Sequence, residues 1–88
     1  MRDINNILRN LPLGYSEVLY QDVRYGLITK AFNNGKSLKV FAEALGATDF
    51  ISLNYYKTKD SEYLKPCEMP EEKVIHFLRN FKPIADGN

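Results

Sequence analysis

The spacing of apolar side chains changes twice along this sequence, and these changes constrain the fold more than any other feature. Near the N-terminus, Asp3 can act as an N-cap, because its carboxylate can accept hydrogen bonds from free backbone N–H groups. Pro12 and Gly14 end the segment. Between these signals, apolar residues follow the i, i+3, i+4, i+7 spacing of one helical face: Ile4, Ile7, Leu8 and Leu11. The spacing predicts a short N-terminal helix.

In the middle of the chain, apolar and polar residues alternate with the period of two that is typical of β-strands. Asn34-Gly35 is the strongest hairpin signal, because both residues tolerate the positive φ angle that a type I′ turn needs. Short connections favour an antiparallel meander of four to five strands. The predicted strands span residues 15–20, 23–32, 37–44, 50–58 and 62–65.

The helical period returns near the C-terminus, in the spacing of Val74, Phe77, Leu78 and Phe81. Pro70 suits the first helical position and Pro83 stops the helix, so residues 84–88 are expected to fray. The whole pattern predicts a single α+β domain over residues 1–88. Its N-terminal and C-terminal helices are expected to pack on one face of the sheet.

Composition excludes several classes of protein. One cysteine cannot form an internal disulfide, and the apolar runs are far below the roughly 18 residues that span a bilayer. A cytoplasmic location away from membranes is therefore expected. The charge balance of 12 Lys+Arg against 11 Asp+Glu gives no reason to expect a nucleic acid as partner. One Cys and one His cannot make a structural zinc site, so neither a metal nor another cofactor is expected.

The alternation also divides the predicted sheet into two faces. Leu38, Val40 and Ala42, with Ile51, Leu53 and Tyr55, are expected to meet the helices. The reverse face then carries Glu43 and Ser52, and Lys30 and Phe32 join it in one register. Aromatic rings can stack on planar groups and lysine meets phosphate, so a mixed face of this kind can bind a ligand. The candidate binding residues on it are Lys39, Phe41, Asn54 and Tyr56.

Cys67 is the one residue on which an enzyme activity could rest. It precedes the second helix and follows Lys65, a setting that can lower a thiol pKa, whereas Glu68, Glu71 and Glu72 act in the opposite sense. His76 lies nine residues further along, too far for direct proton transfer if both were helical. No complete catalytic constellation is present, so an enzyme is not favoured.

Several segments together resemble a family of short, uncharacterised bacterial proteins, some of which carry the name peptide methionine sulfoxide reductase. The resemblance covers most of the chain, and the segments are Gly14-Tyr15-Ser16, Arg24-Tyr25-Gly26, residues 35–46, residues 49–56 and residues 64–70. The A-type reductases use a Gly-Cys-Phe-Trp motif, and this chain has no Trp. If the name applies, the resemblance implies that Cys67 acts as a lone thiolate that forms a sulfenic acid.

The sequence therefore leads to a non-catalytic binding or interaction module. It would act through the mixed sheet face or an exposed sheet edge on a protein or small ligand, because Tyr is common at interfaces and six are present. Thiol redox chemistry at Cys67 is the first alternative, and weak single-stranded nucleic-acid binding is the second. Self-association as a homodimer also stays open.

Overall fold

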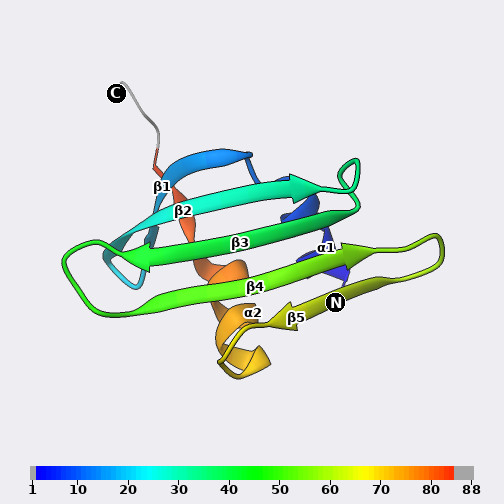
Figure 1. Ribbon diagram of the computed structural model, residues 1–88. Helices are drawn as coiled ribbons and strands as arrows, with labels where there is room; N and C mark the ends of the chain where they lie inside the picture. Colours follow the sequence, from blue (N-terminus) through cyan, green and yellow to red (C-terminus); the bar gives the residue numbers. More distant parts are fainter. Residues whose placement is uncertain (1, 85–88) are drawn as a thin grey trace.

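The protein has an α+β fold in which five consecutive strands stand between two helices in the order of the chain (Figure 1). The structure, a computed structural model, describes residues 2–84. Its elements in chain order are α1 (Arg2–Arg9), β1 (Gly14–Tyr20), β2 (Val23–Phe32), β3 (Ser37–Ala44), β4 (Phe50–Lys57), β5 (Glu62–Pro66), α2 (Glu71–Asn80) and β6 (Lys82–Pro83).

The strands form one antiparallel sheet in the order β5-β4-β3-β2-β1-β6. The predicted meander is thus confirmed for β1 to β5, but the sheet has six strands instead of four to five. The additional strand, β6, forms after α2, where the chain turns back beside β1 and Val18 pairs with Pro83. The Ile84 N–H also donates to the Glu17 carbonyl at 3.1 Å. A two-residue strand containing proline has no alternation by which it could be predicted.

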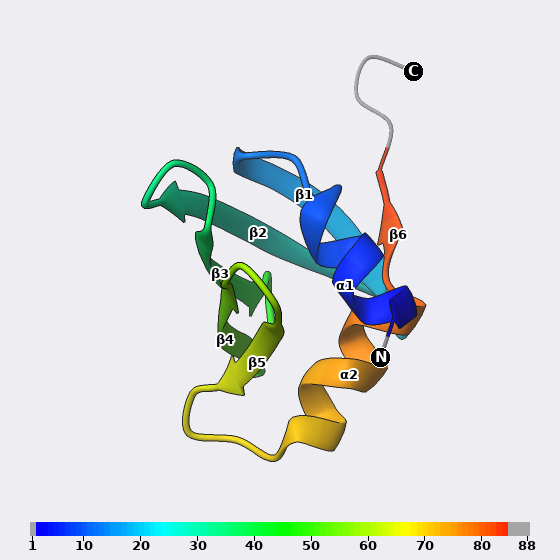
Figure 2. The ribbon, with the colours of Figure 1, turned by 90° about the vertical axis from the view of Figure 1, so that its right-hand side faces the viewer.

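Both helices lie on the same side of the sheet, as Figure 2 shows, and together they cover one of its faces. The helices bury their apolar stripes completely or nearly so: Ile4 and Leu8 from α1, and Val74, Phe77 and Leu78 from α2. These side chains join the covered face of the sheet in one hydrophobic core. Burial of this apolar surface is the main stabilising contribution to the fold.

Charged side chains tie the two ends of the chain together across the helices. Arg79 on α2 donates from Nε to Asp3 Oδ2 at 2.7 Å and from a second nitrogen to Oδ1 at 3.2 Å. Because α1 begins at Arg2, Asp3 lies within its first turn, and the prediction of Asp3 as the N-cap is wrong. Pro70 is the N-cap of α2, one residue before the position predicted for it.

The turns differ from expectation in one respect. The two-residue turn with positive φ at both positions is Gln21-Asp22, which joins β1 to β2. The Asn-Gly pair instead lies in a four-residue loop in which Asn33, Asn34 and Gly35 all have positive φ. Asparagine and glycine tolerate this conformation best, so the loop sequence still sets the hairpin.

Within residues 2–84, neither helix has the length and apolar character needed to cross a bilayer. The predicted fraying of the tail concerns residues 85–88, which lie outside the described part of the chain.

Candidate functional site: the open face of the sheet

The strand register assigns every sheet residue to one of two faces. The face under the helices holds the predicted apolar set, in which Leu38 at 9% is the most exposed member and Val40, Ala42, Ile51 and Leu53 are fully buried. That prediction is confirmed. The opposite face, called the open face below, has no element packed on it among the described residues (Figure 2). All four candidate binding residues, Lys39, Phe41, Asn54 and Tyr56, belong to the open face.

Three lysines and an asparagine form a line across the open face. Lys30 pairs with Lys39, Lys39 with Asn54, and Asn54 with Lys65, so the four residues lie side by side on β2, β3, β4 and β5. We call this line the lysine row. Like charges placed directly opposite each other on neighbouring strands destabilise a sheet. The repulsion between Lys30 and Lys39 in this row therefore lowers the stability of the fold.

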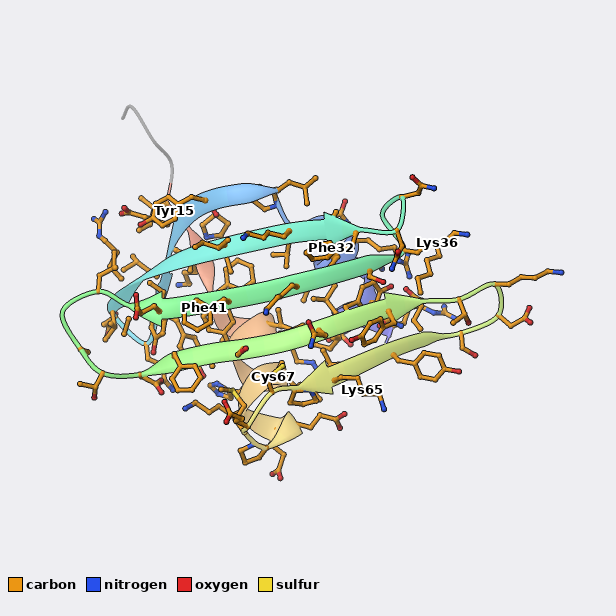
Figure 3. The ribbon with its side chains drawn as sticks, in the orientation of Figure 1. Tyr15, Phe32, Lys36, Phe41, Lys65 and Cys67 are labelled. Atoms are coloured by element: carbon orange, nitrogen blue, oxygen red, sulfur yellow. The ribbon has the colours of Figure 1, made fainter. Side chains whose placement is uncertain are left out.

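Aromatic residues flank the lysine row on both sides. The first flanking line, which we call the tyrosine row, lies two residues along each strand from the lysine row and is made of Phe32, Ser37, Tyr56 and Tyr63. Two positions in the other direction lies the Phe41 row, made of Tyr15, Ile28, Phe41 and Ser52. Tyr15, Phe32, Tyr56 and Tyr63 are all exposed, from 41% for Tyr56 to 60% for Tyr15. Figure 3 looks onto this face and shows Tyr15, Phe32 and Phe41 on it.

Two hollows border the lysine row and the end of the sheet beyond the tyrosine row, and a third lies at the end with Glu43 and Phe50. One lies between the lysine row and the Phe41 row and is lined by Ile28, Lys30, Lys39 and Phe41. Another lies at the end of the sheet beyond the tyrosine row and is lined by Lys36 and Lys59 from two loops and by Lys57 from the end of β4. Its lining residues are Asn34, Gly35, Lys36, Lys57, Thr58 and Lys59. Lysines and rings thus alternate in successive bands along the strands.

The near-neutral net charge hides a local excess of positive charge. Four of the cations form ion pairs, namely Arg9 with Glu62, Arg24 with Glu17, Lys73 with Asp49 and Arg79 with Asp3. Five lysines have no ion-pair partner among residues 2–84 and lie in the lysine row or in the loops at the end of the open face: Lys30, Lys36, Lys39, Lys59 and Lys65. Lys57 stands opposite Glu62 on the helix side of the sheet. Asp60 is the acid closest to the five lysines in sequence, in the turn beside Lys59. The net charge of the chain therefore does not describe this face.

The opposite end of the open face carries Glu17 and Glu43, and the Glu17 carboxylate is hydrogen-bonded to neighbouring side chains. Glu17 accepts from Arg24 at 2.7 Å and from the Tyr15 hydroxyl at 3.1 Å, and these bonds hold the Glu17 pKa below its ordinary value. The ring of Tyr15 lies over Gly26, where an added Cβ would meet the hydroxyl oxygen at 2.9 Å. Glu43 and Phe50 complete this end. The acids and the free lysines are thus separated along the strands.

The structure separates Cys67 from His76. Cys67 is half-buried on the open face, where its N–H donates to the Ser52 carbonyl and its Sγ accepts from Asn54 Nδ2 at 3.3 Å. His76 lies on the helix side, with Nδ1 hydrogen-bonded to the Tyr20 hydroxyl. The two therefore make no catalytic pair. Among residues 2–84, no group of three or more His, Cys, Asp and Glu side chains is placed to hold a metal ion.

Both sheet edges carry features that discourage strand addition. The outer strand β5 is only five residues long and contains Lys65 and Pro66, and charges and proline on an edge disfavour pairing with another chain. The β1 edge is partly covered by β6. The open face is a better candidate for binding than either edge.

A half-buried polar cluster on the helix side of the sheet joins Tyr25, Asp49 and Lys73. Tyr25 donates to Asp49 Oδ2 at 2.9 Å, and Lys73 of α2 donates to Asp49 Oδ1 at 2.6 Å. Burial, followed by the bond to Asp49, raises the pKa of Tyr25 to about 12. The bond from Lys73 and then that from Tyr25 lower the pKa of Asp49. These groups are fully engaged with each other, so their role is to anchor α2 to the loop before β4.

Sequence reasoning missed some of the residues that complete the open face. Tyr63 and Lys65 were seen only as part of a short strand, and Tyr15 had no assigned face. The alternation within residues 62–65 is the signal that could have assigned the two β5 side chains, once β5 was aligned with β4. Cross-strand alignment is not encoded in the alternation of a single strand.

Comparison with protein-family models, with curated proteins and with solved structures finds no match to this chain. The resemblance drawn from the sequence therefore stays a prediction.

Proposed function

We propose that this chain is a non-catalytic binding module of the cytoplasm and that the open face of its sheet is the ligand-binding surface. The observation that carries the proposal is the gathering of Lys39, Phe41, Asn54 and Tyr56 on one face that no described element covers. Among residues 2–84, seven of the nine exposed large hydrophobic residues belong to this face: Tyr15, Leu19, Ile28, Phe32, Phe50, Tyr56 and Tyr63. Such concentration of exposed apolar side chains is typical of interaction sites.

The chemistry of the surface defines the ligand class. Lysines with no carboxylate partner favour an anionic ligand, and the adjacent rings favour planar or apolar groups beside its charges. Asn54, between Lys39 and Lys65, adds an amide that can donate or accept. The ligand is therefore an anion with flat or apolar parts.

A panel of anions tests this proposal. Amide resonances of the ¹⁵N-labelled protein are followed as inorganic polyphosphate, a polyglutamate peptide and a single-stranded oligonucleotide are added separately. At least one is expected to shift residues of β2 to β5 on the open face, and the variant Phe41→Ala/Tyr56→Ala is expected to lose that binding while keeping its circular dichroism. If none of the three shifts this face, or if the double variant binds as well as the parent, the proposal is wrong.

A second candidate is thiol chemistry at Cys67, favoured by the Asn54 amide that donates to Sγ at 3.3 Å. The test is turnover of methionine sulfoxide with dithiothreitol as reductant, in the parent and in Cys67→Ser. Turnover that disappears in Cys67→Ser supports this candidate, and turnover that is absent or unchanged excludes it.

A further inference from the structure

We infer that the ligand of the open face is a single-stranded nucleic acid, with phosphates along the lysine row and bases stacked on the rings beside it. The inference rests on the proposed binding function of this face and goes further by naming the ligand. It is carried by the placement of an unpaired lysine row between two bands of rings, which the register of β2 to β5 fixes.

The lysine row has the dimensions of a track for a phosphate backbone. Neighbouring strands lie about 4.8 Å apart, so the row from Lys30 to Lys65 spans about 14 Å. A bound strand that crosses β2 to β5 can place successive phosphates near Lys30, Lys39 and Lys65. The repulsion between Lys30 and Lys39 is then relieved by a charge that the described residues do not supply.

The rings stand at the distance that bases need. Residues two positions apart on a strand are separated by about 6.7 Å, and this separates the tyrosine row and the Phe41 row from the lysine row. Bases extending from a backbone on the lysine row therefore reach Tyr56 and Tyr63 on one side, or Phe41 on the other. Stacking of bases on aromatic side chains beside a basic track is the usual mode of single-strand binding.

The row of lysines selects nucleic acid over an acidic protein. The exposed apolar side chains next to the lysine row are mostly rings, with Ile28 the aliphatic member of the two flanking rows. Rings are common at protein interfaces as well, so the selection comes from their combination with a line of unpaired lysines, which matches a backbone of repeated phosphates with a base beside each one. A duplex does not fit, because its paired bases are already stacked on each other.

The second hollow extends the track. Lys36 and Lys59 lie in loops beyond the tyrosine row, and Figure 3 shows Lys36 next to Phe32 at this end of the sheet. The acidic end with Glu17 and Glu43 would repel phosphates and so limits the site to the other half of the face. The bound strand thus occupies the basic half.

Salt dependence measures the contacts. Binding of a labelled single strand of about 12 uridines is followed by fluorescence anisotropy between about 50 mM and about 200 mM salt. If three to five lysines contact phosphate, log K is expected to fall against log salt with a slope of about −2 to −3.5. A slope near zero would overturn the inference.

Matched variants separate charge from stacking. Lys39→Gln and Lys65→Gln are each expected to reduce the magnitude of the slope by about 0.7. Tyr56→Ala and Tyr63→Ala are each expected to lower affinity about tenfold with little change in slope. Lys82→Gln, at the far end of the sheet, and Leu13→Ala, an exposed apolar residue between α1 and β1 that lies off the open face, are the matched controls and are expected to bind like the parent. Controls that lose as much affinity as the test variants contradict the inference.

Four other outcomes overturn the inference in distinguishable ways. If polyphosphate or polyglutamate shifts the open face and the oligonucleotide does not, the proposed function stands and the nucleic-acid ligand is wrong. If a duplex of equal length binds as tightly as the single strand, the proposed function stands and the single-stranded ligand is wrong. If light scattering shows a dimer that Tyr56→Ala dissociates, a second copy occupies the face. If no anion shifts the face, the proposed function fails as well.

Discussion

Lys30 and Lys39 stand directly opposite each other on β2 and β3, and neither has an ion-pair partner within the described part of the chain. A cross-strand pair of like charges lowers stability, whereas a pair of opposite charges raises it. The pair therefore lowers the free energy of unfolding but is expected to strengthen binding of an anion, and a charge-reversing variant can measure both effects.

Replacing one lysine of the pair by an acid is expected to stabilise the fold. Lys39→Glu converts a repulsive pair into an attractive one, so the free energy of unfolding should rise by about 0.5 kcal/mol at low salt. The gain should shrink as salt screens both exposed charges. Urea denaturation at two salt concentrations measures the effect. Binding of the single strand should weaken in the same variant, and a loss of stability together with a loss of binding would indicate a merely structural role.

Tyr25 is expected to control the alkaline limit of stability. Its pKa is raised to about 12 in the fold, mainly by burial, against an ordinary value of 10.0. The corresponding stabilisation is complete below pH 10 and is lost as pH rises towards 12, because the unfolded chain releases the proton first. Tyr25→Phe should flatten this loss, as followed by urea denaturation between pH 8 and 12, and Tyr56→Phe is the exposed control. An unchanged alkaline limb in Tyr25→Phe would contradict this account.

Asp49 is expected to contribute to the acid limit. Hydrogen bonds from Lys73 and Tyr25 lower its pKa below the ordinary 3.8. A carboxylate of this kind stabilises the fold above that value, and the contribution is lost as pH falls below it. Asp49→Asn should therefore be less stable than the parent at pH 7, and the difference should narrow towards pH 2. Asp60→Asn, in an exposed turn, serves as the control and should leave the acid limb unchanged.

Thr29 is a buried hydroxyl without a hydrogen-bond partner among the described residues. It is 1% exposed on the covered face, and its Oγ1 has no bonded neighbour. Valine has the same shape without the unsatisfied oxygen, so Thr29→Val should raise the free energy of unfolding by about 1 kcal/mol. For a domain of this size, the rise corresponds to about 4–8 °C in Tm. Thr29→Ser keeps the hydroxyl and loses a methyl group, so it should melt below the parent. Thermal denaturation that ranks the variants in the reverse order would refute the explanation.

The sequence predicts strand positions well because each long strand carries its own signal. Alternation over residues 37–44 reports burial on one face directly, and β3 has the predicted bounds. The lysine row could not be derived in this way. It depends on which residues of β3 and β5 lie opposite Asn54 of β4. That alignment is set by loop length and by packing of the whole sheet.

Features of very short segments also escaped prediction. β6 is only two residues long, so it has no period that could be recognised. Asp3 has the composition of a cap, yet the approach of Arg79 from α2 gives its carboxylate a distant partner instead. Tertiary contacts of this kind override a local preference of about 1 kcal/mol.

The pairing of β6 with β1 bears on the order in which the protein forms during synthesis. Strands β1 to β5 can pair one after another as they emerge from the ribosome, because each joins its immediate predecessor. The outer edge of β1, however, is covered only after α2 has been made. The bond between Arg79 and Asp3, 76 positions apart, closes at the same late stage. Until residues 79–84 have left the ribosome, the outer edge of β1 therefore lacks both its β6 partner and the closing ion pair, and an uncovered strand edge of this kind can pair with another chain.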